Sequence, residues 1–272
     1  MSFKSLLAHV RVGHDNGGVC AVSAQLAGLF DAQVIGISGA RLSPPFADAP
    51  VDLFEYQEEA AKKSLKELEA AFRQAFRGRD IALSWRSSCD YEMVSDFLAR
   101  EARAADLIVT EPDPAGLLDK LQETHLGPLA LQAGRPVLVV PPGQTELKLN
   151  KAVVAWKDTR EARRAAADAL PLLQKMKDVL VVEACAPHDK EQAAARTADV
   201  AAWLKRHGVA ARAAAHLGKG SDLERLFAVL RDEKGDLVVA GAYGHSRLRE
   251  WVFGGVTMDL LLPGDHRALL SC

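Results

Sequence analysis

Residues 235–257 read GDLVVAGAYGHSRLREWVFGGVT, and this stretch decides the fold class. The apolar run at 237–240 lies between Asp236 and Gly241 and predicts a buried strand. Glycines follow at 241, 244, 254 and 255, with basic and polar residues between them. A glycine-rich turn that leaves a parallel strand and enters a helix presents backbone N–H groups and a helix dipole to an anion. The stretch therefore predicts an α/β protein with a candidate phosphate cradle.

The composition is that of an ordinary globular protein. The 272 residues are 49% apolar and 26% charged, and the formal net charge is −2. This charge gives no electrostatic basis for binding nucleic acid or an anionic membrane. No apolar run approaches the ~20 residues of a membrane-spanning helix. The opening MSFKSLLAHV favours a first strand over a signal peptide. The four cysteines are widely spaced and form no metal-binding pattern, so reduced thiols and a cytoplasmic location are expected.

Apolar runs alternate with helical patterns along the whole chain. Strands are expected near residues 6–10, 34–37, 81–85, 107–109 and 137–140 in the first half, and near 152–156, 179–182, 209–215, 237–240 and 268–270 in the second. This order predicts two doubly wound, Rossmann-like α/β domains, each with a five-stranded, mainly parallel sheet covered on both faces. Ligands of such sheets bind beyond the carboxyl ends of the strands. Residues 157–159, residues 183–184 and the glycine-rich stretch all reach that edge.

The two halves of the chain are repeats of one another. KSLLAHV from Lys4 matches KAVVAWK from Lys151, ADLIV from Ala105 matches GDLVV from Gly235, and RPVLVVP from Arg135 matches HRALLSC from His266. The offsets are 147, 130 and 131 residues, which indicates a duplication. The larger first offset predicts an insertion in the first half, around its proline-rich loop and second helix. The expected domains are residues 1–145 and 149–272.

The glycine pattern resembles that of the universal stress protein family, in particular its tandem-domain bacterial members. The family signature is G-x2-G-x9-G-(S/T) after the fourth strand, and Gly241, Gly244 and Gly254 have this spacing. The helix opening TREARRAAADALPLL from Thr159 is also similar, and with the repeat the resemblance covers the whole chain. Single domains of the family dimerise through the fifth strand. The resemblance thus implies that residues 137–140 and 268–271 meet within one chain as a pseudo-dimer, which covers two sheet edges.

The resemblance also implies a nucleotide site. In ATP-binding members the glycines and the Ser/Thr hold the phosphates, and an Asp after the first strand holds the adenine. In this chain Gly255 stands at the Ser/Thr position, Thr257 matches a second hydroxyl position, and Lys157 stands at the Asp position. The candidate ligand is ATP with Mg²⁺, bound by the second half. The candidate binding residues are Lys157, Asp158, Thr159, Gly241, Gly244, His245, Gly254, Gly255, Val256 and Thr257.

The first half lacks this pattern. Residues 110–113, TEPD, follow its fourth strand without a G-x2-G, and residues 127–130, GPLA, occupy the place of the terminal motif. Pro128 has no N–H to offer a phosphate. The first half is therefore predicted to bind no nucleotide.

Several of these features also have a structural interpretation. The glycine-rich loop can be an inherited turn without a ligand. Asp158 or Thr159 can cap the next helix, with Glu161 completing a capping box from Asp158, and Lys157 can pair with Asp158 or Glu183. Pro171 is expected to shorten or kink that helix. The tryptophans at 156, 203 and 251 are expected to pack in the interior.

Three functions stay open. The first is a cytoplasmic stress-response protein that binds ATP or another adenine nucleotide as a sensor, with at most very slow ATPase activity. The second is a stress-response protein that binds no nucleotide and acts through an unidentified protein partner. The third is an enzyme of the wider adenine-nucleotide α-hydrolase-like superfamily. Adjacent His245 and Ser246 make a poor base and nucleophile, so no catalytic residue and no metal ligand is assigned. A homo-oligomer is compatible with each function.

Overall fold

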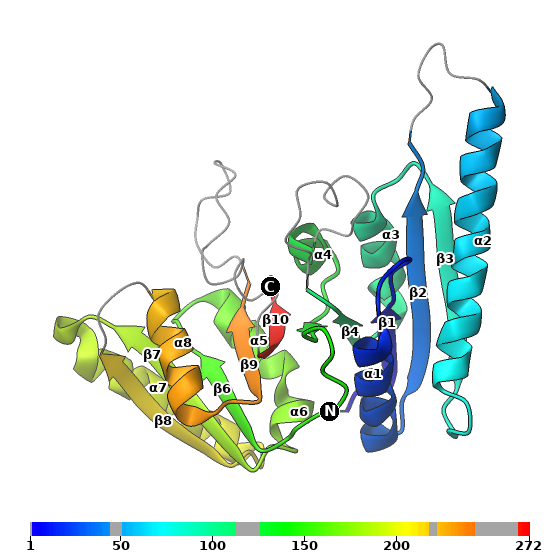
Figure 1. Cartoon of the computed structure of the whole chain (residues 1–272). Helices are drawn as coiled ribbons and strands as arrows, with labels where there is room; N and C mark the ends of the chain where they lie inside the picture. The colour runs from blue at the N-terminus through cyan, green and yellow to red at the C-terminus, as the bar shows by residue number, and fades with distance from the viewer. Residues whose placement is uncertain (1, 44–50, 113–125, 218–221, 243–265) are drawn as a thin grey trace. The chain divides into compact units, whose positions relative to one another are not determined.

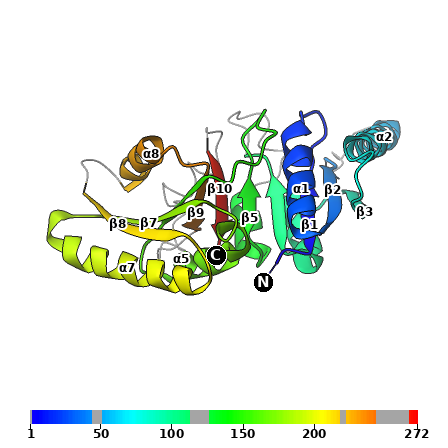
Figure 2. The same cartoon turned by 90° about the horizontal axis from the view of Figure 1, so that it is seen from below.

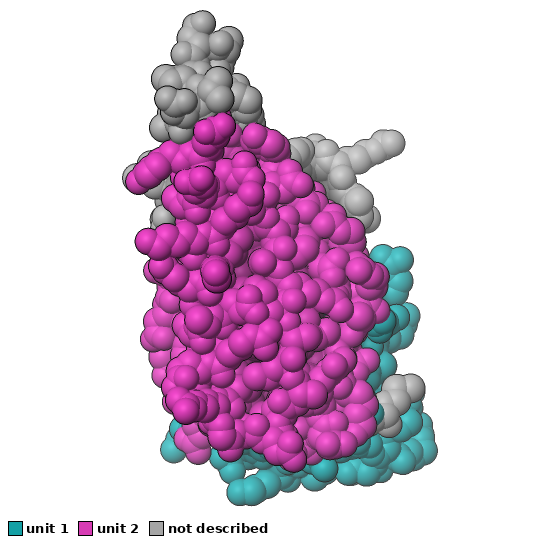
Figure 3. All heavy atoms as spheres, turned by 90° about the vertical axis from the view of Figure 1, so that its right-hand side faces the viewer, with its two compact units in different colours: residues 1–2, 134–139, 148–272 teal, residues 3–133, 140–147 magenta. Residues whose placement is uncertain are grey.

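The structure is a computed structural model that describes residues 2–43, 51–112, 126–217, 222–242 and 266–272 (Figure 1). Contacts divide the chain into two compact units, which Figure 3 colours separately. The N-terminal unit comprises residues 3–133 and 140–147, and the C-terminal unit comprises residues 1–2, 134–139 and 148–272. The domain bounds of 1–145 and 149–272 stay a prediction. Within the described residues, no helix combines the length and the apolar composition that crossing a bilayer requires.

The N-terminal unit is a parallel sheet with helices packed against it. Its strands have the order β3-β2-β1-β4, and every neighbouring pair is parallel. Helix α1 contacts α2, and α3 contacts α4. The elements in chain order are β1 (Ser5–His9), α1 (Gly17–Phe30), β2 (Gln33–Arg41), α2 (Val51–Ala75), β3 (Leu83–Asp90), α3 (Val94–Glu101), the short 3-10 helix η1 (Ala102–Ala104), β4 (Leu107–Thr110) and α4 (Leu126–Gln132).

An aromatic cluster fixes α2 on this sheet. The ring centroid of Phe72 lies 4.9 Å from that of Phe76 and 5.5 Å from that of Trp85. Gly36 of β2 lies against these rings, because a Cβ at this position would come within 2.6 Å of Trp85 Cε3 and 2.7 Å of Phe72 Cε1. The rings fill the volume that any larger residue would need, so only glycine fits here.

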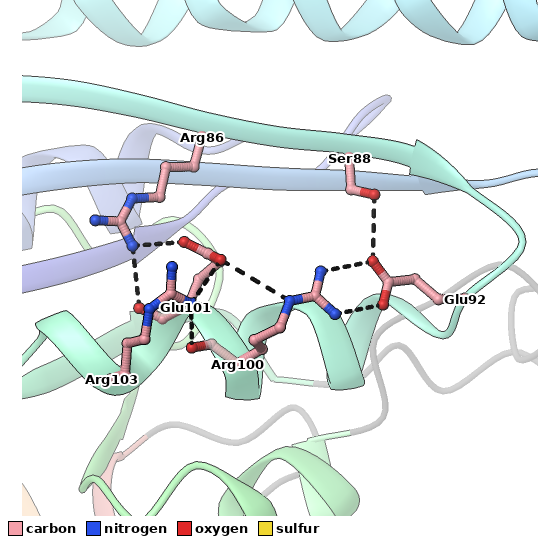
Figure 4. Close-up of polar contacts among 6 residues, drawn as sticks. All are labelled: Arg86, Ser88, Glu92, Arg100, Glu101 and Arg103. Atoms are coloured by element: carbon pink, nitrogen blue, oxygen red, sulfur yellow. Dashed lines mark hydrogen bonds and ion pairs between the residues drawn. The ribbon is translucent and has the colours of Figure 1, made fainter.

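A network of ion pairs joins β3 to α3 (Figure 4). Glu101 pairs with Arg86 at 2.6 Å and with Arg103 at 2.8 Å, while both terminal nitrogens of Arg100 donate to Glu92. Burial acts to raise the pKa of Glu101, but Arg103 and Arg86 outweigh it and hold this pKa below its ordinary value. Both carboxylates of the network are therefore ionised and paired with arginines, an arrangement that stabilises the unit and does not suit acid–base catalysis.

The C-terminal unit has one mixed sheet with the order β5-β10-β9-β6-β7-β8. Helices α5 and α7 lie on one face of this sheet and α8 lies on the other (Figure 2). The elements in chain order are β5 (Val137–Val139), β6 (Lys151–Ala155), α5 (Arg160–Asp168), α6 (Leu170–Leu173), β7 (Asp178–Cys185), the 3-10 helix η3 (Pro187–Asp189), α7 (Lys190–Arg206), β8 (Ala211–Leu217), α8 (Asp222–Glu233), β9 (Leu237–Gly241) and β10 (Arg267–Ser271).

The two fifth strands of the repeat meet, as the sequence predicted. β5 pairs with β10 in antiparallel orientation, with Val139 opposite Ala268 and Val137 opposite Leu270. β10 also pairs in parallel with β9. The α/β fold, the mainly parallel pairing and the intramolecular meeting of the fifth strands are thus confirmed. The expected five strands per domain become four and six per compact unit, because contacts group β5 with the C-terminal unit, where it pairs with β10.

Hydrogen bonds correct the alignment of the two repeats by one residue. In the first repeat, Asp106 accepts from the backbone N–H groups of Lys4 and Ser5. In the second repeat, Asp236 accepts from those of Asn150 and Lys151. The offset from Asp106 to Asp236 is the predicted 130, but Lys4 corresponds to Asn150, an offset of 146 and not 147. The sequence match paired Lys4 with Lys151 because both are lysines. In the structure, equivalent positions are those whose backbone N–H groups make the same hydrogen bonds.

The predicted insertion lies between the second and third strands of the first repeat. Val34 pairs with Leu83, and Val179 pairs with Ala211. The offset between the repeats is 145 at the first member of these pairs and 128 at the second. The difference falls on the loop after β2 and on α2, which has 25 residues where α7 has 17.

Candidate functional site

The candidate site lies at the carboxyl edge of β6 and β9. These strands are parallel neighbours, and Ala155 of β6 pairs with Ala240 of β9. Trp156 and Lys157 therefore leave β6 at the level where Gly241 ends β9. The structure thus brings Lys157, Asp158, Thr159 and Gly241 to one edge of the sheet. Lys157 and Asp158 are exposed.

Gly241 allows the first turn of α5 to pack directly on β9. A Cβ at Gly241 would come within 2.6 Å of the backbone N of Ala162, 2.6 Å of the carbonyl C of Glu161 and 2.9 Å of its Cβ. Two of these neighbours are backbone atoms, which cannot rotate away as a side chain can. The packing of α5 on β9 thus explains why residue 241 is a glycine. From Gly241 the chain continues into the glycine-rich stretch.

Thr159 caps α5. It has extended backbone angles, and its Oγ1 accepts a hydrogen bond from the N–H of Ala162 at 3.3 Å. The capping box from Asp158 is therefore wrong, because the helix begins one residue later than that pattern requires. Glu161 instead lies in the first turn with a buried side chain. Burial acts to raise the pKa of Glu161, but hydrogen bonds from its own N–H, Arg160 and Thr159 lower it.

Arginines neutralise the two carboxylates expected beside Lys157. Asp158 pairs with Arg163. Glu183, on β7, accepts two hydrogen bonds from Arg196 at 2.7 and 3.0 Å.

At the far end of α5, the helical pattern is interrupted at Ala169, and Pro171 lies in the first turn of the separate helix α6. This confirms the expected shortening at Pro171 and leaves α5 a helix of nine residues.

The rest of the predicted cradle lies outside the described residues. This holds for Gly244, His245, Gly254, Gly255, Val256 and Thr257, and also for Ser246 and Trp251. Their roles as phosphate or adenine contacts stay predictions. Within the described residues, no group of three or more His, Cys, Asp or Glu side chains is arranged to hold a metal ion.

The equivalent edge of the N-terminal unit is closed by an arginine. With the corrected alignment, Arg11 occupies the position of Lys157. Its side chain is buried, with 7% of the residue exposed, and its Nη2 donates to the carbonyls of Glu111 and Pro112, which follow β4. The backbone of Arg11 is held in turn by Asn16, which accepts from its N–H at 2.7 Å and donates to its carbonyl at 2.9 Å.

Sequence reasoning missed the role of Arg11. The misaligned repeat placed Arg11 opposite Asp158, so the shared basic residue after the first strand was not visible. With an offset of 146, Arg11 and Lys157 occupy equivalent positions in the two repeats. The side chain of Arg11 is buried at the edge of its sheet, whereas Lys157 is exposed. The closure by Arg11 supports the prediction that the first half binds no nucleotide.

Two buried titratable groups lie beside this closure. Burial raises the pKa of Glu111, and Arg11 opposes this effect. Burial lowers the pKa of His9 well below its ordinary value, and the positive charges of Arg11 and His14 act in the same direction. The Thr110 hydroxyl oxygen lies 2.9 Å from His9 Nδ1 and 3.2 Å from the Glu111 carbonyl oxygen, so His9 has a hydrogen-bond partner in the interior. His9 is thus a neutral imidazole in the folded protein.

His9 predicts a loss of stability in acid. In the unfolded chain a histidine gains its proton near pH 6.5, while the folded protein resists protonation. The contribution of His9 to the free energy of unfolding is therefore fully present above about pH 6.5. It is lost as the pH falls toward the lowered pKa that His9 has in the folded protein. Over this range the free energy of unfolding is expected to fall by up to about 1.4 kcal/mol per pH unit because of His9. Urea unfolding of the protein and of His9→Leu at several pH values measures it. An unchanged slope in His9→Leu would contradict the assignment.

The comparisons with known proteins identify the fold. No protein-family model matches the chain, and no curated protein matches its sequence. Solved structures do match along the whole chain. A universal stress protein from Archaeoglobus fulgidus superposes with a TM-score of 0.72 at 12% identity, covering 98% of this chain and 97% of that one. A protein of unknown function from Pseudomonas aeruginosa superposes with a TM-score of 0.66 at 14% identity, covering 99% and 92%. The chain therefore has the fold of a full-length universal stress protein.

Proposed function

We propose that the chain is a tandem-domain universal stress protein, a cytoplasmic stress-response protein whose second half binds an adenine nucleotide, ATP with Mg²⁺, at the carboxyl edge of β6 and β9. The observation that carries this proposal is the fold likeness, which extends over 98% of the chain and includes both repeats. The sequence resemblance at the glycine-rich stretch supports it independently, because that stretch begins at the carboxyl end of β9.

The described edge supplies part of the chemistry that a nucleotide needs. Lys157 is an exposed cation at the end of β6 and suits a phosphate as a point charge. Gly241 brings the first turn of α5 against the end of β9, so the start of a helix lies beside the start of the glycine-rich stretch. We assign the remaining contacts to Gly244, His245, Gly254, Gly255, Val256 and Thr257. No catalytic residue is assigned, and ATP hydrolysis is at most very slow.

Two departures from the family pattern favour a second candidate, a stress-response protein that binds no nucleotide and acts through a protein partner. Lys157 replaces the acceptor expected for the adenine amino group, and Gly255 removes a hydroxyl from the phosphate position. A lost hydrogen bond to a charged group is worth about 1.5–3 kcal/mol. Both candidates are compatible with a homo-oligomer.

Calorimetry with ATP and Mg²⁺ distinguishes the two candidates. The nucleotide proposal expects a dissociation constant tighter than about 100 μM, equivalent to about −5.5 kcal/mol. It also expects this binding to be lost in Gly244→Val. The matched control is Gly28→Val, at an exposed glycine of α1 with no atom within 4 Å of the added Cβ. The control should bind ATP as the unchanged protein does. No binding at millimolar ATP would overturn the proposal and leave the partner-binding function.

A further inference from the structure

The first part of α2 is helical but buries no side chain. Every residue from 54 to 64 is half-buried or exposed, and the buried residues of this helix, Leu65 and Phe72, come later. Figure 1 shows α2 beside β3, the outermost strand of the N-terminal sheet. Helices in proteins gain most of their stability from a packed face. The first part of α2 is therefore a candidate contact surface.

One side of this segment points away from the sheet. Leu65 and Phe72, seven residues apart, mark the side that packs inward. The opposite side is formed by residues at intervals of three or four, and these are Tyr56, Glu59, Lys63 and Lys66. All four are exposed, and Tyr56 exposes 71% of its surface, a large fraction for an aromatic residue. We call this side the α2 face.

The charges of the α2 face are weakly committed within the helix. Lys63 pairs with Glu67 at 3.9 Å, and 80% and 68% of the two side chains are exposed. Ion pairs this exposed contribute little to stability. Within the described part of the chain, no ion pair includes Glu59 or Lys66. The charged groups of the α2 face are thus accessible to groups of a second molecule.

The α2 face is complementary to a second copy of itself in antiparallel orientation. With a twofold axis at the level of Ala61, Glu59 of one copy lies opposite Lys63 of the other, and Tyr56 lies opposite Lys66. Each contact then occurs twice, as in any twofold interface. The first contact is an ion pair, and the second places an ammonium group against an aromatic ring. A parallel arrangement would instead place Glu59 against Glu59 and Lys63 against Lys63, so the charges favour the antiparallel one.

From this pattern we propose that the α2 face is a homodimer interface, in which the α2 helices of two copies pack antiparallel across a twofold axis at Ala61. Ala60, exposed beside this axis, allows the helices to approach closely. The pairing of β5 with β10 is made within one chain, so that pairing is not open to a second copy. The contact between two helices is small, so the dimer forms at micromolar or higher concentration. The α2 face lies in the N-terminal unit, and the dimer does not depend on the proposed nucleotide function.

Sedimentation equilibrium of the full chain, from micromolar to near-millimolar concentration, tests the proposal. The expected result is a monomer–dimer equilibrium that weakens as salt is added. Glu59→Lys and Lys63→Glu should each weaken dimerisation about tenfold or more, because each turns two attractive contacts into repulsive ones. The double variant Glu59→Lys/Lys63→Glu should dimerise like the unchanged protein, and the two single variants should form a heterodimer when mixed. The matched control is Arg79→Glu, a charge reversal at an exposed position beyond the end of α2, which should dimerise normally.

Cysteine cross-linking under mild oxidation tests the orientation of the helices. Ala60→Cys should form a disulfide between two copies, whereas Gln74→Cys, exposed near the far end of α2, should not. Both are made in a chain with Cys89 and Cys272 replaced by serine, because these native thiols are only half-buried. A chain that stays monomeric at every concentration would overturn the proposal and leave the α2 face to a different partner. A dimer that neither charge reversal weakens, or one that cross-links at residue 74 and not at residue 60, would contradict it equally.

Discussion

Replacing Arg11 with methionine is expected to lower the free energy of unfolding of the N-terminal unit by about 1.5–3 kcal/mol, the value of a buried hydrogen bond that involves a charged group. Methionine fills a similar volume but donates no hydrogen bonds. The carbonyls of Glu111 and Pro112 would lose the donor that now joins them to β1. The Glu111 carboxyl, with 6% of the residue exposed, would lose the positive charge that favours its ionised form.

Urea unfolding followed by Trp85 fluorescence measures this loss, because Trp85 is the tryptophan of the N-terminal unit. The other three tryptophans can be replaced by phenylalanine in the reference protein. Arg79→Met is the matched control, since Arg79 is exposed, and surface substitutions usually change stability by less than about 0.5 kcal/mol. A loss of less than about 1 kcal/mol in Arg11→Met would mean that Arg11 does not hold the edge closed.

The second large effect is expected at Gly241, where alanine should destabilise the C-terminal unit by about 3 kcal/mol, toward the upper end of typical overpacking costs. The added Cβ would lie 2.6 Å from two backbone atoms in the first turn of α5. Either β9 or the helix must move, and the movement would displace the capped end of α5 from the candidate site. ATP binding should therefore weaken in the same variant.

The same substitution at Gly28 should have the opposite sign. Gly28 is an exposed residue inside α1, and nothing lies within 4 Å of the Cβ that alanine would add there. Alanine at such a helix position stabilises by roughly 0.5–1 kcal/mol. Thermal unfolding of both variants checks the pair. Equal effects at Gly241 and Gly28 would show that the close approach of α5 and β9 does not matter for stability.

Sequence reasoning recovered the framework because apolar runs and glycines report local structure directly. The run at 237–240 became β9, and the matching runs at 137–140 and 268–270 became the antiparallel pair of β5 and β10. The pseudo-dimer followed from family resemblance, since no local pattern states which strands pair. The grouping of β5 with the C-terminal unit could not be predicted, because it depends on contacts far apart in sequence.

The candidate site was recovered less completely, for physical reasons that differ by residue. Thr159 was one of two plausible caps, and only the backbone geometry selects it over Asp158. The role of Arg11 emerges only when the repeats are aligned with an offset of 146. Matching identical residues favours an offset of 147, which is wrong by one residue.

These observations describe a duplicated stress-protein fold whose two carboxyl edges have diverged. In the N-terminal unit a buried arginine joins the ends of β1 and β4, and in the C-terminal unit the equivalent lysine is exposed beside the start of the glycine-rich stretch. We infer that one edge accepts a nucleotide and the other does not.

Native mass spectrometry of the full chain with excess ATP and Mg²⁺ tests this claim most directly, because it counts nucleotides on each chain. The account predicts one ATP per chain, lost in Gly244→Val and unchanged in Gly28→Val. Two ATP molecules per chain would contradict the closure by Arg11, and none would contradict the nucleotide site itself.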